Sequence, residues 1–147
     1  FYIGGTKVGT LFGEAVVITE PALKKDFLFM MKQHGARLAK GRLLGIQFDA
    51  LFTDDLYLKI SRHAIDMAHQ IREIFVSAGY PLLFDSPTNQ QYPILPDSDL
   101  AELGKSFGYE YWEHVDETHS GVRFCASWAT TQENVDALRA AVQALKK

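Results

Sequence analysis

The segment that decides the fold is residues 53–79, which read TDDLYLKISRHAIDMAHQIREIFVSAG. Its apolar residues recur at three- and four-residue steps, and they are Leu56, Ile60, Met67, Ile71, Ile74, Phe75 and Ala78. This spacing predicts a long amphipathic helix, with Thr53-Asp54-Asp55 as its N-terminal cap and Gly79 with Pro81 as its end. The helix separates two stretches of chain whose patterns differ.

Residues 80–147 alternate between short strands and short helices. The expected strands are 82–84, 91–95, 109–115 and 122–128, and the last two form an antiparallel pair around the polar turn 116–121. Asp97-Ser98-Asp99 is expected to cap a helix over 100–107. Thr130 with Glu133 predicts a capping box for a last helix, whose apolar face is Val135, Leu138, Val142 and Leu145. The order β-β-α-β-β-α predicts a compact two-layer α+β unit.

Residues 1–52 predict a hairpin and then two helices. The hairpin arms are 1–3 and 11–19, with Lys7 in the turn between them. Glu20-Pro21 is expected to begin a helix that ends at Gly35, and a second helix is expected over 38–51. Because this part resembles the edge of something larger, we expect three parts: an edge at 1–52, a linking helix at 53–79 and a small domain at 80–147.

Composition excludes several classes of protein. The chain has 147 residues and a formal net charge of −3, which gives no general argument for a nucleic-acid or membrane partner. Its apolar runs are shorter than the roughly 18 residues that a membrane helix needs. A single cysteine, Cys125, excludes an intramolecular disulfide and a Cys-rich zinc site, and its place among apolar neighbours predicts a small core residue. One thiol also favours a reducing compartment, so we expect a cytoplasmic protein. We also expect no metal site.

Lys7 is the first candidate for chemistry. It lies in Gly4-Gly5-Thr6-Lys7-Val8-Gly9, where glycines leave room for a planar group and Thr6 offers a hydroxyl beside the amine. A lysine that forms a Schiff base needs such space. The alternative is a solvated turn lysine between glycines that only shape the loop.

Arg123 is the second candidate, in the otherwise apolar strand 122–128. A buried arginine must be paired, and a guanidinium binds a carboxylate in a bidentate manner, so an amino-acid substrate is one possible partner. The alternative is an internal pair with Glu110 or Glu113 on the neighbouring strand.

A basic stretch over 24–42 is the third candidate. Its cations have only Asp26 as a counter-charge, and they are Lys24, Lys25, Lys32, Arg37, Lys40 and Arg42. Such a stretch could contact a phosphate group or an acidic surface, or it could be a solvated helix face.

Four separated motifs carry a resemblance to a known family. They are Tyr2-Ile3-Gly4-Gly5-Thr6-Lys7-Val8-Gly9, the run from Lys32 to Arg42 (KQHGARLAKGR), Ser86-Pro87-Thr88-Asn89-Gln90, and Val122-Arg123 with Ser127-Trp128-Ala129-Thr130. In order and spacing the chain resembles the low-specificity threonine aldolases. With the aromatic β-eliminating lyases, that family belongs to the fold-type I enzymes that depend on pyridoxal 5′-phosphate (PLP).

The resemblance implies an α/β fold, the C-terminal part of a fold-type I PLP-dependent transferase-like fold. Residues 1–52 would be the C-terminal edge of the large PLP-binding domain and 80–147 the small C-terminal domain. It implies that Lys7 forms the covalent aldimine with PLP, beside Thr6, and that Arg123 binds the substrate carboxylate. Lys32 and Arg37 match a basic segment that reaches toward an active site, with Lys40 and Arg42 as alternatives. Family members are homodimers or homotetramers.

The implied activity is cleavage of threonine or allo-threonine to glycine and acetaldehyde. The run Thr6-Lys7-Val8-Gly9 departs from the Ser-Lys-Gly-Leu-Gly typical of the family, which leaves substrate preference open. One alternative is PLP-dependent β-elimination on an aromatic or sulfur amino acid, and another is a non-catalytic α+β binding module. The phosphate-binding, ring-stacking and pyridinium-pairing segments of the family cannot be located here. We therefore expect a fragment, roughly the last two-fifths of such an enzyme, inactive without the N-terminal half.

Overall fold

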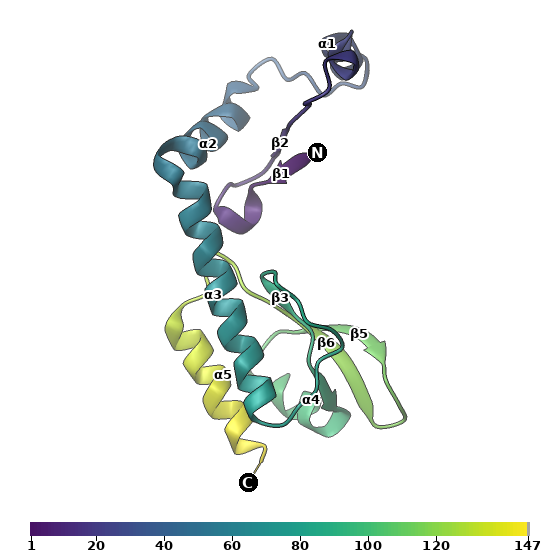
Figure 1. Ribbon diagram of the computed structural model, residues 1–147, viewed down its shortest axis with the longest axis vertical. Helices are drawn as coiled ribbons and strands as arrows, with labels where there is room; N and C mark the ends of the chain where they lie inside the picture. The colour runs from purple at the N-terminus through teal and green to yellow at the C-terminus, as the bar shows by residue number, and fades with distance from the viewer. Residues whose placement is uncertain (147) are drawn as a thin grey trace. The chain divides into compact units, whose positions relative to one another are not determined.

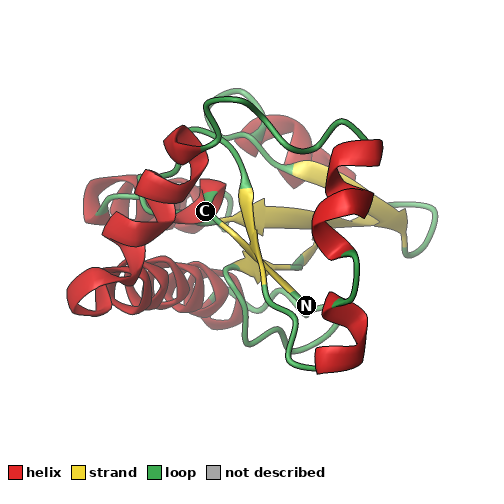
Figure 2. Cartoon of the chain, turned by 90° about the horizontal axis from the view of Figure 1, so that it is seen from above, coloured by secondary structure: helices red, strands yellow, loops and turns green. Residues whose placement is uncertain are grey.

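The computed structural model describes residues 1–146 of the chain. It divides into two compact units, Phe1–Ile60 and Ser61–Lys147, and each is described by itself (Figure 1). The chain contains both helices and strands (Figure 2), so the predicted α/β class is confirmed.

The first unit begins with the predicted hairpin. Strands β1 (Tyr2–Gly4) and β2 (Glu14–Val16) pair antiparallel, with Tyr2 opposite Val16. The second arm is shorter than the predicted 11–19. Gly13 turns the chain just before β2 with a φ of +98°, and the ladder closes on hydrogen bonds between Phe1 and Val17. A short 3-10 turn, η1 (Thr6–Val8), lies between the two strands.

The single helix expected from Glu20 to Gly35 is wrong. The chain forms a 3-10 turn, η2 (Pro21–Lys24), and a separate helix, α1 (Phe27–Gln33). Asp26 separates them with a φ of +57°, a left-handed conformation that no right-handed helix can continue through. Gly35, with a φ of +69°, ends α1 as predicted.

Helix α2 (Arg42–Phe52) completes the first unit and begins four residues later than expected. Its Phe48 and Leu51 form a small buried cluster with Val8 from η1. Ala15, Tyr57 and Ile60 pack against this cluster. The hairpin turn that carries Lys7 is therefore anchored to α2 through Val8.

The long helix is confirmed as α3 (Leu56–Ser77). A 3-10 turn, η3 (Thr53–Asp55), stands where a simple cap was expected, because Asp54 and Asp55 both have positive φ values, +52° and +59°. The buried face of α3 carries Ala64, Met67, Ala68, Ile71, Ile74 and Phe75. Leu56, expected in that stripe, is 40% exposed.

The second unit is built around strand β6 (His119–Cys125). Three strands pair with β6 antiparallel, and they are β3 (Gln90–Gln91), β4 (Ile94–Pro96) and β5 (Glu110–His114). Helix α5 (Gln132–Ala144) lies beside the C-terminal part of α3 (Figure 1). Side chains of α3, α5 and β6 share one apolar core with Phe75, Val122 and Val135 at its centre. The order of strands and helices expected for residues 80–147 is present, and the compact unit also includes most of α3.

Three local predictions in this unit are wrong. Residues 82–84 form no strand beyond a single bridge from Leu82 to Pro93. Helix α4 (Asp97–Leu103) begins three residues early, so Asp97, expected in the cap, lies inside the helix and accepts a hydrogen bond from Ser120. The capping box of α5 joins Thr131 and Asn134. The hydroxyl of Thr130, expected in that role, accepts instead from the backbone of Ser127.

Candidate active site

Lys7 lies on a turn whose backbone is closely fixed. The carbonyl of Gly5 accepts hydrogen bonds from the N–H groups of Val8 and Thr10, both at 3.0 Å. Gly9 follows with a φ of +100°, which reverses the chain at a position where a side chain would be strained. Since Val8 is buried while Thr6 and Lys7 are exposed, the turn leaves both the hydroxyl and the amine accessible to solvent.

The glycines near Lys7 differ in how much room their surroundings leave for a side chain. A Cβ at Gly4 or Gly9 would meet nothing within 4 Å. A Cβ at Gly5 would lie 2.6 Å from Thr10 Cγ2 and 3.0 Å from Phe48 Cζ, so Gly5 is needed for packing. Among the described residues Lys7 forms no ion pair and no side-chain hydrogen bond. Its amine is available to react with a ligand.

The cations of the basic stretch are all exposed. Lys32 lies in the last turn of α1, Arg37 and Lys40 lie in the loop after it, and Arg42 begins α2. None of these four cations forms an ion pair within residues 1–146. The stretch is therefore a surface of unpaired positive charge, and the structure does not distinguish among the four.

Arg123 lies on β6 in the second unit, directly opposite Glu110 on β5. Its Nη2 donates to the Glu110 carboxylate, and its Nη1 donates to Gln90 Oε1 at 3.2 Å. The hydrogen bond that Arg123 donates to Glu110 raises the pKa of Arg123 above its ordinary value. Of the two internal partners considered above, the structure selects Glu110. Arg123 nevertheless remains 26% exposed, so an incoming ligand can reach it.

An open depression of about 300 Å³ lies beside Arg123. It is lined by Gly108, Tyr109, Glu110, Arg123 and Cys125. Cys125 is exposed there, so its prediction as a core residue is wrong. The reason is alternation along β6, where Phe124 points into the core and its neighbours point away.

Sequence reasoning missed three residues that support Arg123. Gln90 accepts from it, and the Trp112 ring centroid lies 5.7 Å from its Cζ, within the range of a cation–π interaction. Tyr92 donates to the same Gln90 oxygen at 2.9 Å. The only signal in the sequence was the position of Gln90 in the Ser86–Gln90 motif, to which no role was assigned.

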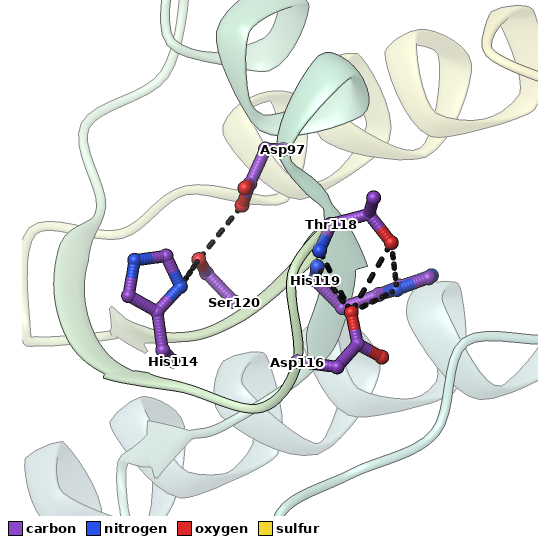
Figure 3. A network of polar contacts seen from close by, with 6 residues as sticks. All are labelled: Asp97, His114, Asp116, Thr118, His119 and Ser120. Atoms are coloured by element: carbon purple, nitrogen blue, oxygen red, sulfur yellow. Dashed lines mark hydrogen bonds and ion pairs between the residues drawn. The ribbon is translucent and has the colours of Figure 1, made fainter.

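The hairpin between β5 and β6 holds a second polar network (Figure 3). Asp116 Oδ1 accepts from the backbone N–H groups of Thr118 at 2.8 Å and His119 at 2.9 Å, and it lies 3.0 Å from His119 Nδ1. These hydrogen bonds, first that from Thr118, lower the pKa of Asp116 to about 2. Ser120 donates to Asp97 at 2.7 Å. The network closes the turn between the two strands. The described residues contain no cluster of three metal-ligating side chains.

Lys7 with Thr6 and Arg123 with its supports belong to different units. The first unit presents Lys7 and the basic stretch, and the second unit presents Arg123. Within residues 1–146 no helix is both long and apolar enough to cross a membrane.

Known proteins resemble this chain in sequence and in structure. No protein-family model matches the chain. The chain is 30% identical over 133 residues to the low specificity L-threonine aldolase of Pseudomonas aeruginosa, a match that covers 90% of the chain and 38% of that protein.

Among solved structures, the threonine aldolase of Leishmania major matches the whole chain with a TM-score of 0.96 and 37% identity, and the match covers 43% of that protein. Serine palmitoyltransferase of Sphingomonas wittichii matches with a TM-score of 0.64 at 12% identity, over 97% of the chain and 38% of that protein, which shows likeness of fold alone. The chain thus spans about two-fifths of the length of the proteins it matches, 38% to 43%.

Proposed function

We propose that this chain, which is related to the low-specificity threonine aldolases and has the fold of the C-terminal part of fold-type I PLP-dependent enzymes, supplies the catalytic lysine and the carboxylate-binding arginine of a threonine aldolase. The reaction is cleavage of threonine or allo-threonine to glycine and acetaldehyde. The observation that carries the proposal is Lys7, an exposed amine with no side-chain partner among residues 1–146, on a turn that glycines keep open.

The residues around Lys7 fit pyridoxal phosphate. Lys7 would hold it through Nζ, and the hydroxyl of Thr6 lies next along the chain. Open space at Gly4 and Gly9 leaves room for a planar ring against the backbone. When bound, pyridoxal phosphate supplies an electron sink for the negative charge that develops at the substrate Cα.

Arg123 binds the substrate α-carboxylate in this proposal. A guanidinium matches a carboxylate in shape and charge, and Gln90 with Trp112 holds the group in one orientation. By fixing the carboxylate, Arg123 restricts rotation of the substrate about its Cα and so helps to select the Cα–Cβ bond for cleavage.

The basic stretch is proposed to add positive charge for substrate binding through Lys32 and Arg37, with Lys40 and Arg42 as alternatives. Its support is the row of exposed cations without internal partners in the described residues. Single substitutions of the four to alanine, compared by KM for threonine, identify the cation that contributes.

The test is an assay of the protein encoded by the complete reading frame that contains residues 1–147, loaded with pyridoxal phosphate. Acetaldehyde and glycine are expected from threonine. K7A is expected to lower kcat by on the order of a thousandfold or more, because no other amine replaces the lysine. K105A, an exposed lysine paired with Glu102 in the other unit, is the control and is expected to retain activity.

Other products separate the alternatives. Pyruvate and ammonia from an aromatic or sulfur amino acid, with no acetaldehyde from threonine, would establish β-elimination in its place. Activity that survives K7A would reject the lysine assignment. We also propose a cytoplasmic homodimer or homotetramer, to be measured by cell fractionation and by light scattering of the same protein.

A further inference from the structure

We propose that Glu110 is an exchangeable carboxylate, which occupies Arg123 when substrate is absent and is displaced by the substrate carboxylate. In the same inference, Gln90, Tyr92 and Trp112 are permanent supports that keep the guanidinium in place during the exchange. This inference rests on the proposed function, since it describes how that carboxylate site is kept ready.

The permanent side of the site is held by two hydrogen bonds to one oxygen and by the buried Tyr92. Gln90 Oε1 accepts from both Arg123 Nη1 at 3.2 Å and the Tyr92 hydroxyl at 2.9 Å. Tyr92 is itself buried, and its ring packs 4.4 Å from Phe84 and 5.0 Å from Trp112, measured between centroids. Because Tyr92 cannot move without disturbing two aromatic neighbours, it fixes the oxygen that orients Arg123.

Trp112 reaches the guanidinium because of an irregularity in the sheet. The register of β5 against β6 shifts between Tyr111 and Glu113, so Trp112 is the extra residue on its strand. A bulge of this kind re-aims a side chain, and here the indole ring lies 5.7 Å from Arg123 Cζ.

The Glu110 side of the site is exposed and makes a single contact. The Glu110 side chain is 70% exposed, against 26% for Arg123. Its carboxylate accepts from Nη2 alone, and Nη1 donates to Gln90. Arg123 Nε has no acceptor among the described residues but is buried, so an incoming carboxylate would bind the two Nη groups, each of which carries two N–H donors. The internal pair therefore leaves part of the hydrogen-bonding capacity of the guanidinium unused.

The relative strengths of the two ion pairs favour exchange of Glu110 for a substrate carboxylate. An exposed ion pair contributes little net stability, because water screens it and holding the side chains costs entropy. A carboxylate that binds two guanidinium donors makes a stronger pair than one that binds a single donor. The depression of about 300 Å³ beside Glu110 and Arg123 gives an incoming carboxylate an approach and gives Glu110 room to turn away.

The experiment compares E110Q with E113Q in the complete protein loaded with cofactor. Glutamine keeps the size of Glu110 but removes the competing charge. Glu113 lies on the same strand, opposite Gly121, and forms no pair with Arg123, so it is a matched control. E110Q is expected to lower KM for threonine about two- to fivefold and to leave kcat unchanged. The effect is small because the ion pair that is removed lies at the surface. E113Q is expected to match the wild type.

A second readout does not depend on catalysis. Sodium acetate, compared with sodium chloride at equal ionic strength, is expected to raise the melting temperature of E110Q more than that of the wild type or E113Q, and to have no such effect on R123K. Equal acetate shifts in all four proteins, or a KM in E110Q no lower than in E113Q, would overturn the exchange. An acetate shift that follows this pattern in a protein without threonine cleavage would support the exchange and reject the proposed reaction.

Discussion

Arg123 and Gln90, on the paired strands β6 and β3, are joined by a hydrogen bond of 3.2 Å from guanidinium to amide oxygen. This contact makes Gln90 a positioning residue for any carboxylate that Arg123 binds. The Tyr92 hydroxyl donates to the same Gln90 oxygen and so helps to fix this contact. A substitution at Gln90 or Tyr92 is therefore expected to affect a bound carboxylate through Arg123.

The first prediction concerns Q90L in the complete protein. Removing the acceptor leaves Arg123 Nη1 without its partner, and a hydrogen bond to a charged group contributes about 1.5–3 kcal/mol. We expect KM for threonine to rise by about tenfold or more with a smaller change in kcat, as measured by steady-state kinetics. Y92F is expected to produce a weaker effect of the same kind.

The control for this experiment is Q143L, at an exposed position on α5 remote in sequence from the Arg123 strand pair. If Q90L and Q143L have the same KM, Gln90 does not position Arg123.

The second prediction concerns the turn that carries Lys7. In G5A the new Cβ would lie 2.6 Å from Thr10 Cγ2, and Thr10 is too short and too branched to swing away. Overpacking of this kind costs about 1–3 kcal/mol, and we expect that loss in the free energy of unfolding measured with urea. The catalytic turn would be displaced together with its Lys7.

Gly4 supplies the matched control, because a Cβ there would meet nothing within 4 Å. G4A should therefore be close to the wild type in stability. The double variant G5A/T10A removes the clashing group and should recover most of the loss, which a double-mutant cycle measures. Equal stabilities for G4A and G5A would contradict the packing argument.

An element could be predicted from the sequence alone where its pattern is local and repeated. Helix α3 was predicted because its buried residues, from Met67 to Phe75, recur at helical spacing and because burial of that face stabilises the helix. The break at Asp26 was not predicted, because a positive φ at a residue other than glycine leaves no mark in composition.

Only the reactive groups of the candidate site could be predicted from the sequence, and the residues that support them could not. Lys7 and Arg123 were identified from residue type and from a family resemblance, and their roles stay predictions. The choice of Glu110 over Glu113 as the internal partner depends on strand register, and the bulge at Trp112 shifts that register by one residue. Alternation along a strand cannot reveal an inserted residue, so Trp112 entered the site only with the structure. Gln90 entered with it because its contact with Arg123 depends on which strands pair.

The third prediction uses the lowered pKa of Asp116, which is about 2 in the folded chain against an ordinary value of 3.8. The folded form therefore binds this proton less tightly than the unfolded form does. The charged carboxylate stabilises the fold above pH 3.8, and this contribution decreases as the pH falls and is lost below about 2. In D116N the side-chain oxygen still accepts from Thr118 and His119, but the group no longer titrates.

The measurement is urea unfolding of the wild type, D116N and D116A at several values between pH 5 and pH 2. The stability advantage of the wild type over D116N is expected to shrink across this interval, because it depends on ionisation of Asp116. D116A should be less stable than D116N throughout, since alanine also loses the hydrogen bonds that close the turn (Figure 3). E117Q changes a neighbouring carboxylate that accepts none of these hydrogen bonds and serves as the control. Parallel curves for the wild type and D116N from pH 5 to pH 2 would show that the charge of Asp116 does not stabilise the hairpin.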